Sequence, residues 1–126
     1  MGMDPVAPSV MLARHGLAPS KERGQNFLVD PNVARKIVQA VGPAPDDTVV
    51  EIGSGFGAIT FGLAERAGKV VAVEYDAGIV RAFRSEYGEP PGIALLHADF
   101  LETDLEEIRE SEGGRKLLVA GNLPYN

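Results

Sequence analysis

Four short apolar runs recur in the chain after its first third, and each one ends in polar or acidic residues. They lie at residues 48–52, 70–73, 93–98 and 117–120. Runs of this length with so few polar positions are typical of strands buried on both faces of a parallel sheet. The pattern therefore predicts four strands in one sheet.

Segments with the periodicity of helices separate these runs. We expect helices at about residues 58–67, from the residue after Asp76 to about residue 87, and at about residues 105–110. Asp76 and Asp104 stand where their side chains can cap the second and third of these helices. The alternation of strand and helix predicts an α/β fold, with a mainly parallel sheet and helices on both of its faces.

Two further helices are expected before the first strand. Ser9 is placed to cap a short helix that ends at Arg14, with Gly16 as its stop. Asp30-Pro31 predicts the start of the second helix, because an acidic cap followed by a first-turn proline favours helix entry. The apolar residues of this helix share one face, and a Gly-Pro pair at 42 and 43 follows them: Val33, Ile37, Val38 and Val41.

The chain divides into three parts. Residues 1–8 contain two prolines and are expected to be disordered, residues 9–45 form an N-terminal helical segment, and residues 46–126 form the first half of an α/β domain. The sequence ends directly after the fourth strand, which would leave a strand edge and one face of the sheet uncovered. We therefore expect it to be the N-terminal portion of a longer protein.

The turn after the first strand is the feature that points most directly to a binding site. Gly53, Gly55 and Gly57 alternate immediately after a strand that ends in Glu51 and Ile52. Glycine permits a tight turn and lets a ligand come close to the backbone. Because the carboxyl ends of strands in an open α/β sheet form the crevice for nucleotide-like ligands, we expect such a ligand at this loop.

Polar residues follow the other strands as well, and in a parallel sheet these ends lie along one edge. Besides Glu51 they are Glu74, Asp99 and Asn122. Glu74 follows Gly55 by 19 residues, the usual separation for an acid that accepts hydrogen bonds from ribose hydroxyls. Taken singly, Glu74 could cap a helix and Asp99 could cap a turn. Together, the four strand ends favour a ligand site.

Two nucleoside cofactors are compatible with this arrangement. Gly53, Gly55 and Ala58 formally satisfy the dinucleotide fingerprint, which would suit NAD. S-adenosylmethionine has no phosphate, and it needs one acid near its ammonium group and a further acid for the adenine amino group. Glu51 and Asp99 could provide these acids, whereas the additional carboxylate would repel a pyrophosphate. The electrostatics therefore favour the sulfonium cofactor.

Composition excludes several other classes. The chain has no Cys, which rules out disulfides and cysteine-ligated zinc, and His15 and His97 lack the spacing of metal ligands, so we expect no metal. No apolar run approaches the roughly 20 residues of a membrane span and no secretion signal is present, so we expect a cytoplasmic protein without a membrane partner. The net charge of −6 argues mildly against a nucleic-acid surface, although residues 1–45 carry +2 and residues 46–126 carry −8.

Five motifs resemble, in order and spacing, those of the rRNA adenine dimethyltransferases. They are GQNFL at 24–28, EIGSGFG at 51–57, VEYD at 73–76, HAD at 97–99 and NLPYN at 122–126. The resemblance covers about residues 9–126, and Ser54 stands where a proline is common in that family. It implies a Rossmann-like S-adenosylmethionine-dependent methyltransferase fold that is truncated after the fourth strand, with three more strands and a C-terminal helical domain absent.

The resemblance also implies an activity. Members of the family use S-adenosylmethionine to dimethylate the exocyclic amines of two adjacent adenosines near the 3′ end of small-subunit (16S) rRNA during ribosome biogenesis, and release S-adenosylhomocysteine. The expected partner is this rRNA or the immature 30S subunit, bound by a full-length, monomeric protein, and we expect the fragment itself to be inactive on rRNA. The alternatives are a 23S rRNA adenine methylase or mitochondrial transcription-factor relative of the same family, an NAD-binding Rossmann oxidoreductase domain, and a non-catalytic assembly factor for ribosomal subunits.

One group of residues is implied to hold the cofactor. Asn26 and Leu28 would close over it, and Gly53 and its neighbours would line the methionine portion. Glu74 would hold the ribose hydroxyls and Asp99 the adenine amino group.

A second group, in the NLPYN motif, is implied to bind the target base. Asn122, which also belongs to the cofactor site, would bind the amine together with the backbone of Leu123 and Pro124, and Tyr125 would stack on the flipped adenine. The exocyclic nitrogen of adenine is a poor nucleophile, so two acceptors that favour a pyramidal nitrogen in line with the methyl group would supply most of the catalysis through positioning.

Overall fold

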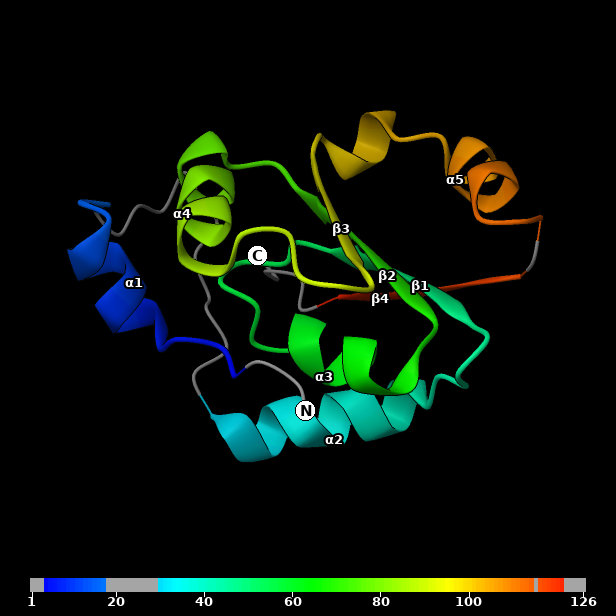
Figure 1. Ribbon diagram of the computed structural model, residues 1–126, viewed down its shortest axis with the longest axis horizontal. Helices are drawn as coiled ribbons and strands as arrows, with labels where there is room; N and C mark the ends of the chain where they lie inside the picture. Colours follow the sequence, from blue (N-terminus) through cyan, green and yellow to red (C-terminus); the bar gives the residue numbers. More distant parts are fainter. Residues whose placement is uncertain (1–3, 18–29, 115, 122–126) are drawn as a thin grey trace.

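The computed structural model of the protein describes residues 4–17, 30–114 and 116–121. Within these ranges the chain forms a four-stranded sheet in which all neighbouring strands are parallel (Figure 1). The strands are β1 (Thr48–Ile52), β2 (Lys69–Glu74), β3 (Ile93–His97) and β4 (Leu117–Gly121). The four predicted strands are confirmed, with differences of one residue at their ends.

The strand order is β3-β2-β1-β4. The chain runs outward from β1 through β2 to β3, and then returns to place β4 on the other side of β1. Ligands of open α/β sheets bind at the carboxyl ends of the strands next to such a reversal of order. An added Cβ at Gly121 would lie 2.7 Å from the carbonyl oxygen of Ile52, which shows how closely β1 and β4 approach at this point.

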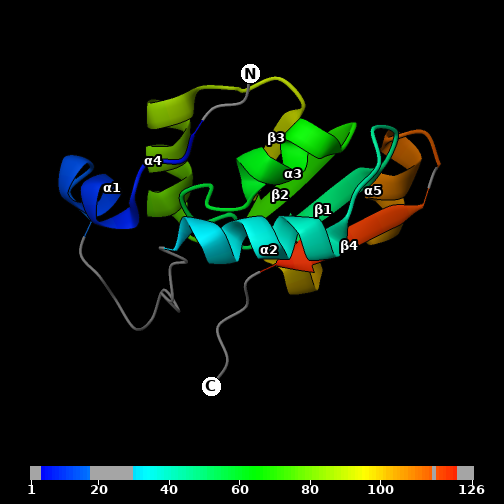
Figure 2. The same ribbon diagram turned by 90° about the horizontal axis from the view of Figure 1, so that it is seen from below.

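Helices cover both faces of the sheet. They are α1 (Pro8–Arg14), α2 (Pro31–Val41), α3 (Thr60–Arg66), α4 (Ala77–Tyr87) and α5 (Leu105–Ser111), with a 3₁₀ turn, η2 (Phe100–Glu102). The face that bears Val49 and Val70 packs against α2 and α3, and the opposite face, with Val50 and Val71, packs near η2 and α5 (Figure 1). α1 lies beside α4 at one end of the sheet in both views (Figures 1 and 2). Among the described residues, no helix is long and apolar enough to cross a membrane.

Local sequence signals set most of the helix ends. The side chains of Asp30, Asp76 and Asp104 each accept a hydrogen bond from a backbone N–H in the first turn of α2, α4 and α5. Gly42 ends α2 in the left-handed conformation, with a φ of 58°. These caps were predicted from the sequence and are confirmed.

Two predicted helix starts were wrong. Ala7 rather than Ser9 is the N-cap of α1, because Pro8 occupies the first helical turn, where its missing N–H costs nothing. α3 begins at Thr60, two residues later than expected, because residues 55–59, which include Gly55 and Gly57, form consecutive turns.

The N-terminal segment also differs in part from the prediction. We expected residues 1–8 to be disordered, but within the described part of that range Val6 packs against the apolar cluster between α1 and α4, and Pro8 belongs to α1.

Candidate functional site

A glycine loop joins β1 to α3 at the carboxyl edge of the sheet. The N–H of Gly53 donates to the carbonyl oxygen of Val73 over 2.7 Å, which fixes the start of the loop against the end of β2. Gly57 has a φ of 93°, and an added Cβ there would lie 2.6 Å from the ring of Phe61. At Gly53 an added Cβ would meet no atom of the described residues within 4 Å, so among these residues the space beside this part of the loop is open.

Glu74, the last residue of β2, is bonded directly to this loop. One carboxylate oxygen accepts from the N–H of Gly55 over 2.9 Å, and the other accepts from the N–H of Asp76 over 3.0 Å. The residue is buried, with 8% of its surface exposed. The acid that the sequence places 19 residues after Gly55 therefore lies against the glycine loop and holds it to the first turn after β2.

An open pocket of about 500 Å³ lies next to Glu74. It is lined by Glu74, Tyr75, Asp76, Ala77, Gly78, Arg81 and His97. Tyr75 is 73% exposed at this pocket, although large aromatic side chains usually bury much of their surface. A hydrogen bond of 3.1 Å joins Nε2 of His97 to the carbonyl oxygen of Tyr75, so the strand end of β3 supports the backbone of this aromatic residue.

Glu51 lies beneath the glycine loop and is fully buried. One of its oxygens accepts from the hydroxyl of Thr60 over 2.5 Å, whereas the other, Oε2, is buried and has no hydrogen-bond partner among the described residues. Burial raises the pKa of Glu51 to about 8; the hydrogen bond from Thr60 opposes this shift and the nearby charge of Glu74 adds to it. A cationic group placed near this buried carboxyl would favour its charged form and lower its pKa again.

Asp99 takes a local role in the structure. Its side chain accepts a hydrogen bond from the N–H of Leu101 over 3.0 Å and forms the N-cap of η2. This is the turn-capping alternative that the sequence left open. The carboxylate follows β3 by two residues, and it is not among the residues that line the pocket.

The structure therefore brings together part of the predicted site. Glu51, Gly53, Gly55, Gly57 and Glu74 gather at the carboxyl ends of β1 and β2. Six of the predicted residues lie outside the described ranges: Asn26, Leu28, Asn122, Leu123, Pro124 and Tyr125.

Two residues of the site, Tyr75 and Thr60, were not identified from the sequence. Tyr75 directly follows the acid at the end of β2, and this position in the sequence could have suggested it. Thr60 is the first residue of α3 and contacts Glu51 only through the fold, so no local signal marks it.

These features define a class of protein. A parallel sheet that reverses order next to β1, a glycine loop after β1 and an acid bonded to that loop at the end of β2 form a Rossmann-like methyltransferase domain. The sequence profile described as ribosomal RNA adenine dimethylase matches residues 18–126. The chain belongs to this family.

Individual relatives agree with this assignment. The chain is 43% identical over 111 residues to the Ribosomal RNA small subunit methyltransferase A of Geobacter metallireducens, covering 88% of this chain and 40% of that protein. The crystal structure of the 23S rRNA methyltransferase ErmE superposes with a TM-score of 0.68 at 30% identity and covers 80% of this chain and 38% of ErmE. A dimethyladenosine transferase from Plasmodium falciparum superposes with a TM-score of 0.60 at 25% identity, over 76% of this chain and 33% of that one. The chain thus spans about two fifths of the length of the curated relatives it matches.

Proposed function

We propose that this protein binds S-adenosylmethionine and that, in the whole protein, methyl groups are transferred to the exocyclic amines of two adjacent adenosines near the 3′ end of small-subunit rRNA. Residues 46–126 would contribute the first half of the catalytic domain. The observation that carries the proposal is the carboxylate of Glu74, which is bonded to the glycine loop and borders a pocket large enough for a nucleoside.

The described residues fit this cofactor. Glu74 retains acceptor capacity for ribose hydroxyls, because each carboxylate oxygen can accept more than the one hydrogen bond it has from the backbone. The exposed ring of Tyr75 offers an apolar face to an adenine. The unpaired oxygen of Glu51 suits an ammonium group, and the open space beside Gly53 suits the methionine portion.

The same features disfavour NAD. A pyrophosphate needs donors and positive charge around it, whereas the carboxylate of Glu74 lies beside this glycine loop, and the buried carboxyl of Glu51 beneath it would ionise only next to a cation. The amino-acid end of S-adenosylmethionine brings its own ammonium group to this position.

Bound S-adenosylmethionine would supply a methyl group on a positively charged sulfur. The residues of the chain would hold and orient the two reactants. Asn122 and the backbone around Pro124 are proposed to accept hydrogen bonds from the adenine amine, and Tyr125 to stack on the base, which would repay about 1–3 kcal/mol of the cost of taking it out of its stack.

Small-subunit rRNA is preferred over 23S rRNA as the target. The chain is 43% identical to a relative named for the small subunit and 30% identical to the 23S rRNA methyltransferase ErmE. The proposed partner is therefore the immature 30S subunit, which the whole protein would meet in the cytoplasm.

Calorimetric titration with S-adenosylmethionine and, separately, with NAD tests the cofactor. The wild-type protein is expected to bind the first and not the second. Glu74→Ala should weaken binding of S-adenosylmethionine by about 1–3 kcal/mol, because charged hydrogen bonds are lost. Glu65→Ala, which removes an exposed acid on α3, is the matched control and should bind like the wild type. A preference of the wild type for NAD would end the proposal.

The target is tested with the whole protein. Incubation with radiolabelled S-adenosylmethionine and either immature 30S or 50S subunits should label the small-subunit rRNA. Labelling of 23S rRNA alone would replace the proposed target with the alternative one.

A further inference from the structure

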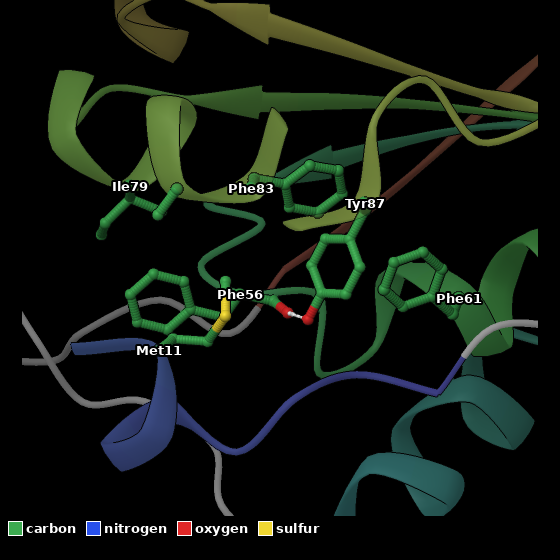
Figure 3. Packing of buried hydrophobic residues seen from close by; sticks show 7 residues of the cluster. Met11, Phe56, Phe61, Ile79, Phe83 and Tyr87 are labelled. Carbon is green, nitrogen blue, oxygen red and sulfur yellow. Dashed lines mark hydrogen bonds between the residues drawn. The ribbon is translucent and has the colours of Figure 1, made fainter. Parts of the chain in front are cut away.

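The hydroxyl of Tyr87, at the end of α4, joins two segments that are distant in sequence. It donates to the carbonyl oxygen of Phe56 over 2.9 Å (Figure 3), and it accepts from the backbone N–H of Val6 over 2.8 Å. Phe56 is the residue between Gly55 and Gly57 in the glycine loop. Tyr87 therefore ties that loop to the segment that leads into α1.

The position of this hydroxyl is fixed by the surrounding rings. The ring of Tyr87 makes edge-to-face contacts with Phe61 and Phe83, each with ring centroids 4.8 Å apart. Only 9% of the residue is exposed. Burial also raises the pKa of the Tyr87 phenol, so the hydroxyl keeps the proton that it donates. A side chain held in this way can hold the backbone of Phe56 in one place.

The glycine loop is consequently fastened from two sides. Glu74 accepts from the N–H of Gly55, and Tyr87 donates to the carbonyl oxygen of the next residue, Phe56. The side chain of Phe56 is also enclosed, in the cluster that contains Met11 of α1 and Ile79 of α4 (Figure 3).

The residue next to Tyr87 strengthens the same connection. Glu86 accepts a hydrogen bond from the guanidinium of Arg14 over 2.7 Å, and its other oxygen is joined to the ring of His15 over 3.1 Å. Two successive residues of α4 thus hold both the approach to α1 and its C-terminal end, while one of them also holds the glycine loop.

We propose that Tyr87 is a positioning residue for cofactor binding, which sets the backbone of Phe56 so that the glycine loop meets the amino-acid end of S-adenosylmethionine. This inference rests on the proposed function. It assigns to a residue at the far end of α4 a role that the sequence motifs of the loop do not contain. Tyr87 acts through Phe56 and is not expected to touch the cofactor.

Tyr87→Phe tests the proposal, because it keeps the ring and removes only the hydroxyl. Calorimetric titration should show S-adenosylmethionine binding weakened about 3- to 10-fold, as expected for the loss of one hydrogen bond that orders a binding loop. 5′-Methylthioadenosine has the nucleoside and lacks the amino-acid end. Its binding should weaken by less than half of the factor found for S-adenosylmethionine.

Phe83→Leu is the matched control, since it loosens the same aromatic cluster and its hydrocarbon side chain makes no hydrogen bond to the loop backbone. It should lower the melting temperature at least as much as Tyr87→Phe and leave the affinity for S-adenosylmethionine unchanged. Equal losses of affinity in the two variants, equal losses for both ligands, or an unchanged affinity in Tyr87→Phe would each overturn the positioning role. Absence of S-adenosylmethionine binding by the wild type would instead refute the proposed function.

Discussion

The buried carboxyl group of Glu51 makes a strong prediction about the pH dependence of stability. Burial raises its pKa from the usual 4.5 to about 8. Between these two values the folded protein holds a proton that the unfolded chain has released. The free energy of unfolding should therefore fall as the pH rises. This loss of stability should be absent below pH 4.5 and complete above pH 8.

The size of the effect follows from the shift. Each pH unit in this window should remove about 1.4 kcal/mol, so the full rise in pKa corresponds to about 5 kcal/mol. This is comparable with the total stability of many domains, which is about 5–15 kcal/mol. Glu51→Gln removes the titration, while its amide oxygen can still accept the hydrogen bond from Thr60.

Urea denaturation of the wild type and Glu51→Gln at pH 5, 6.5 and 8 measures the effect. The variant should gain stability over the wild type by about 4 kcal/mol between pH 5 and pH 8. Glu65→Gln, at an exposed acid, should follow the wild type at all three values. If the stabilities of the wild type and Glu51→Gln change in parallel with pH, Glu51 does not carry a raised pKa and the interpretation of its burial is wrong.

Three further outcomes are expected. Gly57→Ala should lower the free energy of unfolding, measured by urea denaturation, by at least about 2 kcal/mol, because the backbone there has a φ of 93° and the added Cβ would contact Phe61. Gly53→Ala, where only the φ is unfavourable, should lower it less, and equal losses would argue against the contact. Tyr75→Ala should weaken binding of 5′-methylthioadenosine by about 0.5–1.5 kcal/mol, whereas Tyr75→Phe, which keeps the ring, should not. Equal affinities of the wild type and both variants would exclude stacking on this ring. Binding of S-adenosylmethionine at pH 7 should release protons, because Glu51 ionises beside the ammonium group. Calorimetry in buffers of different ionisation enthalpy detects this release, and a binding enthalpy that is the same in all buffers would contradict it.

Much of the fold could be predicted from local patterns. The apolar runs marked all four strands to within one residue, because strands buried on both faces need an unbroken apolar segment. The capping roles of Asp30, Asp76 and Asp104 were also predictable, since each depends only on the residues that follow it. The prediction that Ser9 caps α1 was wrong, because Pro8 already occupies the first turn of this helix.

The candidate site was predictable only in part. Glu74 and the glycines were found because their spacing along the chain reflects a strand–loop–helix–strand unit of standard length. The pairing of Thr60 with Glu51 and of Tyr87 with Phe56 depends on how α3 and α4 pack, which no local pattern encodes. For Asp99, the sequence allowed both a turn cap and a ligand contact; the structure shows the turn cap, and the contact to the adenine amino group stays a prediction. The roles of Asn26, Leu28, Asn122 and Tyr125 stay predictions.

The two backbone hydrogen bonds of Glu74 have a consequence for the affinity and selectivity of ligand binding. A glutamate side chain on a free surface samples many rotamers, and immobilising it on binding costs about 0.5–1.5 kcal/mol. Here the Gly55 and Asp76 amides already hold the carboxylate in one orientation before any ligand arrives. A nucleoside whose hydroxyls match that orientation loses no affinity to freezing this side chain, whereas one that required the carboxylate to rotate would have to break two hydrogen bonds first.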